Sequence, residues 1–262
     1  MVFSWWRNRR RRKILKQPFP EAWNEILERN FALFRTLDEH EQERLRRKTQ
    51  IFIAEKYWEG AGGLVVAEEM QVTIAAQACL LVLGMEHELF ERLLTVLVYP
   101  EGYFAPNKQI GPAGLVTEST DLRLGEAWSR GPVILSWSDV LRGGRIPNDG
   151  QNVVFHEFAH VLDMHDQYPD GIPALDSVEE LQTWQQVMTA EYNRLVRHSA
   201  RRRATLLDHY GAENEAEFFA VATECFFEKP AEMSTMHPRL YKVLCGFYRQ
   251  DPAARVSRQF VT

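Results

Sequence analysis

The stretch NVVFHEFAHVLDMHD, residues 152–166, places His156 and His160 four positions apart with Glu157 between them. Apolar residues surround the three, which predicts a helix. Because four residues make a little more than one helical turn, both imidazoles project from one face. Two imidazoles placed in this way can bind one tetrahedral Zn²⁺. Glu157 lies about 100° around the helix, where it could act as a base on a water molecule at the metal without binding the metal itself.

The competing interpretation is a core helix whose histidines make only local hydrogen bonds. The chain has 8 histidines among 262 residues, so a chance HExxH pattern is rare. The opposite face of the helix is apolar, with Val154, Phe158, Val161 and Leu162. A zinc-peptidase helix needs this division between chemistry and packing, and the metal-site interpretation is favoured.

Asp163 lies on the histidine face, three residues after His160. It follows His156 by about 10.5 Å along the helix axis, too far for the two to share a metal ion. Asp163 could accept a hydrogen bond from the His160 ring and orient that ring. It could equally be a solvated acid near the helix end, and the sequence leaves both roles open.

A catalytic zinc ion usually takes a third ligand from the protein. One candidate is Asp166, ten residues after His156, which is the spacing at which metzincins place their third ligand; His165 misses this spacing by one. The metzincin arrangement also needs a glycine turn at the position that Asp163 occupies here.

The other candidate is Glu217, in the aromatic-rich segment NEAEFFAVATECFF of residues 214–227. A carboxylate among so many aromatic side chains is partly buried, and a buried charge requires a partner or a metal. Glu224, seven residues later, shares the face of Glu217, whereas Glu215 is the expected solvent-facing acid. Asn214 and Glu217 have capping-box spacing, so Glu217 could instead close the helix start.

The elements that must position these residues follow from the hydrophobic pattern. Helices are predicted over residues 21–37, over about 39–57, and in a more buried segment that stops at Gly84. Short β-rich runs at 93–100, 113–120 and 131–137 predict a small sheet. The motif helix comes next, with Asn148 or Asp149 as its N-cap, and further helices begin at Ser177, in the Glu217 segment and near Pro238. Helices, a small sheet and then helices indicate an α+β fold.

The composition limits the function classes. The net charge of −5 gives no reason to expect a nucleic-acid partner for the chain as a whole. The three cysteines, Cys79, Cys225 and Cys245, form no CxxC pair and fit a reducing compartment. Since no apolar run has secretory or membrane-spanning length, we expect a cytoplasmic protein with no transmembrane segment.

Both ends of the chain are expected to be tails around one domain. A basic run from Arg7 to Lys13 follows Trp5 and Trp6 and could touch anionic lipid or nucleic acid. The favoured interpretation is a solvated, flexible tail over residues 1–19. A single domain is expected over residues 20–252, helical to about residue 90 and then formed by the sheet and the catalytic helices, with a C-terminal tail over residues 253–262.

The segments HEFAHVLDM, YGAENEAEFFAVATECFFEKP and LCGFYRQDP, with VLVYP and GPVILSW before them, resemble the Mlc titration factor A family of bacterial zinc metallopeptidases. The resemblance covers about residues 20–252, and it extends distantly to the catalytic domain of anthrax lethal factor. It implies a zincin-like fold, mostly helical with a small mixed sheet, and one Zn²⁺ per chain held by His156, His160 and Glu217. It also implies that Glu157 is the catalytic base and that Tyr210 stabilises the transition state.

The expected function is hydrolysis of peptide bonds by a metal-activated water. The strand GPVILSW could be an edge strand that pairs with an extended substrate, or a buried core strand. The resemblance adds aminopeptidase activity and binding of a transcriptional repressor such as Mlc. The alternative is a non-catalytic protein that sequesters a regulator and has a structural or regulatory zinc, although a site with three ligands beside a glutamate favours catalysis.

Overall fold

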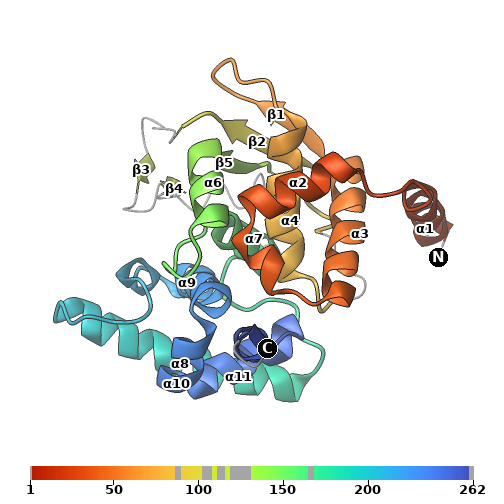
Figure 1. Cartoon of the computed structure of the whole chain (residues 1–262). Helices are drawn as coiled ribbons and strands as arrows, with labels where there is room; N and C mark the ends of the chain where they lie inside the picture. Colours follow the sequence, from red (N-terminus) through yellow and green to blue (C-terminus); the bar gives the residue numbers. More distant parts are fainter. Residues whose placement is uncertain are drawn as a thin grey trace.

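The computed structural model describes residues 2–85, 90–101, 108–110, 116–118, 131–164 and 168–259. The first part of the chain forms α1 (Val2–Ile14), α2 (Glu21–Asn30), η1 (Ala32–Thr36), α3 (Glu39–Glu55), β1 (Tyr57–Gly60), α4 (Glu68–Leu81), β2 (Thr95–Tyr99), β3 (Lys108–Ile110), β4 (Val116–Glu118) and β5 (Val133–Ser136). The second part forms α6 (Trp137–Arg145), α7 (Val153–Asp163), α8 (Val178–Ala200), η3 (His209–Ala212), α9 (Glu215–Glu228), α10 (Pro230–Met236), α11 (Pro238–Tyr248) and α12 (Pro252–Gln259). In Figure 1 the sheet lies at the top, α8, α10 and α11 gather at the bottom, and α7 and α9 lie between them.

The predicted α+β fold is confirmed, and the chain is mostly helical. The described strands form a three-stranded sheet in the order β1-β2-β5, and Leu97 of β2 pairs with Glu59 on one side and Ile134 on the other. Both pairings are parallel, whereas the family resemblance led to the expectation of a mixed sheet. The antiparallel pair β3-β4 forms a separate ladder. Among the described strands β5 is therefore an edge strand.

The predicted helices are present, but two of them are shorter than predicted. The predicted helix 21–37 divides into α2 and η1 at Phe31. The predicted helix 39–57 ends at Glu55 because the next residues pair with β2 as strand β1. The N-terminal part of the domain, which was predicted to be helical to about residue 90, therefore contributes strand β1 to the sheet.

Gly84 has a different role from the predicted one. Helix α4 already ends at Leu81, so the glycine does not terminate the helix. A Cβ atom on Gly84 would lie 2.3 Å from the carbonyl oxygen of Tyr248 and 2.4 Å from that of Arg249. Glycine is required here because the backbone after α11 passes too close for any side chain.

Within the two predicted tails, residues 2–14 and 253–259 are helical, which corrects the expectation for these residues. Helix α1 is held to α3 by a bidentate pair, in which Arg11 Nε and Nη2 lie 2.9 and 2.7 Å from the Glu55 carboxylate. Helix α12 is held by Arg255, whose Nη2 lies 2.7 Å from Glu41 Oε1. These partners are 44 and 214 residues away in sequence, so no local pattern could reveal the docking.

Aromatic packing fixes the orientation of α7. Phe158 lies with its ring centroid 4.8 Å from that of Phe90 and 5.8 Å from that of Phe52 in α3. Phe155 packs on Phe227 of α9 at 5.3 Å. Of the predicted apolar face, Val154, Phe158 and Leu162 are buried and Val161 is half-buried. None of the described helices is both long and apolar enough to cross a bilayer.

Candidate metal centre

Helix α7 begins later than predicted, with Asn152 as its N-cap. The Asn152 side chain accepts a hydrogen bond from the Phe155 N–H at 3.1 Å. Asn148 and Gly150 instead adopt positive φ angles of 69° and 84°, so residues 148–150 form a turn before the helix. The predicted N-caps Asn148 and Asp149 are wrong, because both residues lie in the turn that precedes the helix.

The structure brings His156, His160 and Glu217 together from two helices. Glu217 Oε2 lies 3.0 Å from His156 Nε2 and 3.5 Å from His160 Nε2, and the two ring nitrogens are 3.2 Å apart. One donor atom from each of the three residues lies within 4.8 Å of the other two. The predicted pairing of the histidine helix with the acidic helix is thus present in the described residues.

These three separations fit a zinc ion. Ligand atoms at Zn–N and Zn–O distances of about 2.0–2.1 Å in a tetrahedron are roughly 3.3–3.4 Å apart, and the three observed separations bracket that value. Two imidazoles and one carboxylate are also a donor set typical of catalytic zinc, which leaves a fourth position open. The three side chains therefore form a group that could hold a divalent cation.

Glu217 has two roles, because its backbone belongs to the capped start of α9 and its carboxylate is a candidate metal ligand. Asn214 caps α9 by accepting a hydrogen bond from the Glu217 N–H at 2.9 Å, while the Glu217 carboxylate contacts the two histidines. Burial alone would raise the pKa of Glu217, but hydrogen bonds from His156 and His160 outweigh it and hold this pKa well below its usual range. The carboxylate is therefore an anionic donor.

Glu224 is a site residue to which sequence reasoning assigns no role. Its Oε2 lies 2.9 Å from His156 Nδ1, and its Oε1 accepts a hydrogen bond from the Asn152 N–H at 2.8 Å. Asn152 in turn donates to Gln77 of α4 at 2.9 Å. Glu224 thus fixes the ring of one donor histidine and the start of its helix together. The sequence signal that could have identified Glu224 is its position seven residues after Glu217, which puts both on one face of α9.

The same carboxylates set the charge of His156. Burial alone would lower the pKa of His156, but Glu224 and Glu217 outweigh this and raise it to about 10. A hydrogen bond from Nδ1 to Glu224 leaves Nε2 as the ring atom that faces Glu217 and His160. An orienting carboxylate of this kind strengthens a histidine as a metal ligand.

Replacing Glu224 with glutamine is expected to weaken zinc binding about 10- to 100-fold. Glutamine has only one acceptor oxygen, so it cannot serve both His156 Nδ1 and the Asn152 N–H. Competition against a chelator of known zinc affinity measures the change. Glu215→Gln, an exposed position on the same helix, is the matched control. Equal affinity in the two variants would remove Glu224 from the site.

Glu157 and Tyr210 border the donor group without belonging to it. Glu157 follows His156 on α7 and is partly buried; burial raises its pKa, while both histidines lower it and the carboxylates of Glu217 and Glu224 raise it further. The Tyr210 ring lies with its centroid 5.9 Å from that of His156, on η3, which packs against α9. Tyr210 therefore lies beside a candidate ligand and Glu157 follows one in the chain; the roles expected from the resemblance stay predictions.

Asp163 differs from both interpretations of its role. It is fully buried, not solvated, and its Oδ2 accepts a hydrogen bond from the Gly171 N–H at 2.9 Å. Its other oxygen has no hydrogen-bond partner among the described residues. Since Asp163 is the last residue of α7, its carboxylate turns to the chain that returns at Gly171. Burial raises the pKa of Asp163 to about 7, although the Gly171 hydrogen bond and the nearby His160 lower it. His165 and Asp166 lie outside the described residues.

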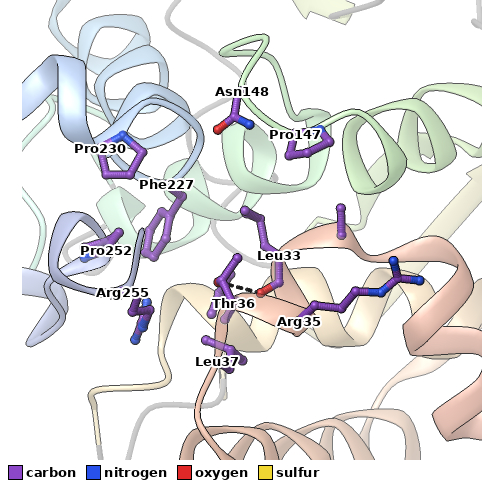
Figure 2. A pocket seen from close by; sticks show the side chains of 12 residues that line it. Leu33, Arg35, Thr36, Leu37, Pro147, Asn148, Phe227, Pro230, Pro252 and Arg255 are labelled. Carbon is purple, nitrogen blue, oxygen red and sulfur yellow. Dashed lines mark hydrogen bonds between the residues drawn. The ribbon is translucent and has the colours of Figure 1, made fainter. Parts of the chain in front are cut away.

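A cavity of about 430 Å³ lies elsewhere in the fold (Figure 2). Its wall includes Leu33 and Thr36 of η1, Phe227 of α9 and Arg255 of α12. Phe227 follows Glu217 by ten residues, which is about 15 Å along the helix axis. The cavity and the metal centre are therefore separate features at opposite ends of α9.

Comparison with known proteins agrees with this geometry. A family model described as glucose-regulated metallo-peptidase M90 matches residues 3–249. An uncharacterised protein of Synechocystis sp. is 38% identical over 249 residues, which are 94% of this chain and 90% of that protein. Mlc titration factor A of Yersinia pestis and that of Yersinia pseudotuberculosis are each 29% identical over 257 residues, which are 97% of this chain and 92% of theirs.

Proposed function

The chain belongs to the glucose-regulated metallo-peptidase family M90, and we propose that it is a zinc-dependent peptidase with His156, His160 and Glu217 as the metal ligands. The observation that carries the proposal is the convergence of these three donors within 4.8 Å. Zinc is the proposed metal because the donor separations fit its tetrahedral geometry. The family supports a metallopeptidase; the identity of the metal and the residue roles are part of the proposal.

The proposed reaction is hydrolysis of a peptide bond by water. Bound zinc would lower the pKa of a water molecule towards about 7 and polarise the scissile carbonyl. The Glu157 carboxylate takes the proton from the attacking water and delivers it to the leaving amine nitrogen. The Tyr210 phenol donates a hydrogen bond to the oxygen that becomes negative in the transition state. Glu224 keeps the His156 ring in position throughout.

The substrate is proposed to bind as an extended strand beside β5. This strand is at an edge of the described three-stranded sheet, and α7 packs against it. A peptide that adds to a free edge gains backbone hydrogen bonds that do not depend on its sequence. Val133 and Leu135 are buried, so the side chains of β5 serve the core while its backbone edge serves the substrate.

Single proline substitutions along β5 are expected to divide into two alternating classes. Successive residues of a strand direct their N–H groups to opposite sides, so one alternate pair of positions faces β2 and the other faces the open edge. Proline on the β2 side destabilises the fold, whereas proline on the open side raises KM about two- to tenfold, the cost of one backbone hydrogen bond. Thermal melts and kinetics at positions 133–136 measure both. An unchanged KM at every folded position would contradict the substrate strand.

Hydrolysis itself is tested by removing and returning the metal. Wild-type protein is incubated with an unstructured protein such as casein and, separately, with aminoacyl anilides. We expect cleavage to stop after chelation and to return with one equivalent of zinc. Cleavage of the anilides would add the aminopeptidase activity that the resemblance implies. Failure to cleave either class with zinc bound at one equivalent would argue against a peptidase.

A second proposed role is binding of a transcriptional repressor. The name of the Yersinia relatives, Mlc titration factor A, is the observation that favours it. If this role is the main one, a Glu157→Gln variant without activity still captures the repressor at wild-type affinity. A cytoplasmic location is part of this proposal, and the three free cysteines support it because they fit a reducing compartment.

A further inference from the structure

Helix α1 presents an aromatic and basic face to solvent. At 100° per residue, Trp5, Trp6, Arg9, Arg12 and Lys13 lie within an arc of roughly 120°. All five side chains are exposed, and the two tryptophans are 53% and 60% exposed. No other described helix has two adjacent tryptophans exposed to this extent. An exposed apolar patch of this kind indicates an interaction surface.

The opposite face of α1 fixes the helix to the rest of the protein. Arg11 forms the bidentate pair with Glu55, Arg7 pairs with Glu91, and Arg10 donates to the carbonyl oxygen of Ala54 at 3.0 Å. Ile14, also on this side, packs against the hydrophobic core. In Figure 1 the helix lies at the periphery, beyond α3. The outer face is thus held in one orientation.

The charge of this face contrasts with that of the whole chain. Residues 7–16 contain seven arginines and lysines, and no acid precedes Glu21, while the chain carries a net −5. The carboxylates of Glu55 and Glu91 pair only with the inner arginines Arg7 and Arg11. Arg9, Arg12 and Lys13 have no carboxylate partner in the part of the chain that the structure describes. Their positive charge therefore faces outward.

We propose that α1 binds the surface of an anionic lipid bilayer and holds the protein there reversibly. Arginine and lysine side chains near a membrane surface are attracted by anionic headgroups, and tryptophan prefers the headgroup level, where its ring is apolar and its N–H is solvated. A helix that lies in the interface needs both an aromatic and a basic component. The outer face of α1 supplies both, and the inner pairs hold the helix against the protein.

The geometry favours lipid over nucleic acid. Proteins that bind single strands stack bases on open aromatic faces. Here the Trp5 and Trp6 rings are nearly perpendicular, at 87°, and the Arg9 guanidinium covers the Trp5 ring at 5.4 Å. The two rings therefore do not form a stacking platform. A bilayer interface makes no such demand on ring orientation.

Sedimentation of the full chain with vesicles tests the proposal. We expect binding to vesicles of phosphatidylcholine with 30% phosphatidylserine, little binding to phosphatidylcholine alone, and release as salt rises to ~0.5 M. The triple variant Arg9→Gln, Arg12→Gln, Lys13→Gln is expected to bind roughly 100-fold more weakly. The matched control, Arg197→Gln, Arg201→Gln, Arg203→Gln, removes the same charge from exposed positions at the end of α8 and is expected to bind like the wild type.

A second readout reports on the tryptophans. Brominated lipids in the same vesicles are expected to quench the tryptophan fluorescence of the wild-type protein. The double variant Trp5→Phe, Trp6→Phe is expected to lose most of that quenching. The absence of vesicle binding, equal loss in both triple variants, or tighter binding to a 20-nucleotide single strand than to the vesicles would each overturn the proposal. Neither readout requires zinc or peptidase activity, so it is independent of the proposed catalytic function.

Discussion

Replacing Glu157 with glutamine is expected to lower kcat by a factor of roughly 10²–10⁴ while the metal stays bound. Glutamine keeps the shape of the side chain but cannot accept the proton of the attacking water. Glu157 is not one of the three converging donors, which are His156, His160 and Glu217, so metal affinity should change little. Single-turnover kinetics on a peptide that the wild type cleaves, together with zinc analysis of the same samples, measure both quantities.

The control for this experiment is Glu179→Gln. Glu179 is an exposed glutamate of α8, so the substitution makes the same chemical change away from the donors. We expect wild-type kcat and one zinc per chain. If Glu157→Gln retained turnover within a few-fold of wild type, the base would be another group, and the mechanism proposed for this site would be wrong.

Replacing Glu217 with glutamine is expected to remove the metal. Wild-type protein should hold one zinc per chain after dialysis against metal-free buffer, and the variant close to none. The reduction in affinity should exceed the 10- to 100-fold expected for an outer partner such as Glu224, because a direct anionic ligand is lost. The low pKa of Glu217 keeps that carboxylate charged throughout the working pH range. Elemental analysis of the dialysed proteins gives the stoichiometry.

Two further variants decide between the candidate third ligands. Glu215→Gln changes the exposed acid two residues earlier on α9 and should keep its zinc. Asp166→Asn tests the metzincin-like spacing and should keep it as well. Loss of zinc with Asp166→Asn and retention with Glu217→Gln would move the third ligand from α9 to the segment that follows α7.

Loss of the metal should also lower thermal stability. A ligand that binds only the folded state stabilises it by about 2.7 kcal/mol when it is present at 100 times its Kd. We expect the melting temperature of the wild type to fall on chelation and that of Glu217→Gln to be insensitive to zinc. This comparison separates a loss of metal from a loss of fold, because the variant should still melt cooperatively.

Local spacing predicted the centre of the site. His156 and His160 had to share a face once residues 153–163 were helical, because the helical repeat is fixed by backbone geometry. The aromatic surroundings of Glu217 likewise indicated a buried acid that needs a partner. Residue types and short-range periodicity sufficed for the two histidines but left Glu217 as either a ligand or a helix-start residue, and the structure places the three side chains together.

Other parts of the site depended on contacts that sequence spacing does not contain. The bond from His156 to Glu224 joins residues 68 apart, and that from Asn152 to Gln77 joins residues 75 apart. The shared helix face made a bond between Asp163 and His160 one of two expected roles, yet the Asp163 carboxylate accepts a hydrogen bond from the Gly171 N–H. A shared face shows which side chains can meet, but not which of several neighbours is closer after packing.

The sequence by itself determined most of the element types, the α+β class and two of the three proposed metal ligands, because these follow from periods of two to four residues. The tertiary structure decided how the strands pair, which acid orients His156, and that α1 and α12 dock on the protein. Those outcomes rest on pairs such as Arg11 with Glu55 and Arg255 with Glu41. Such pairs form only after distant segments are brought together by the burial of apolar side chains, which is non-directional and leaves no local pattern of its own.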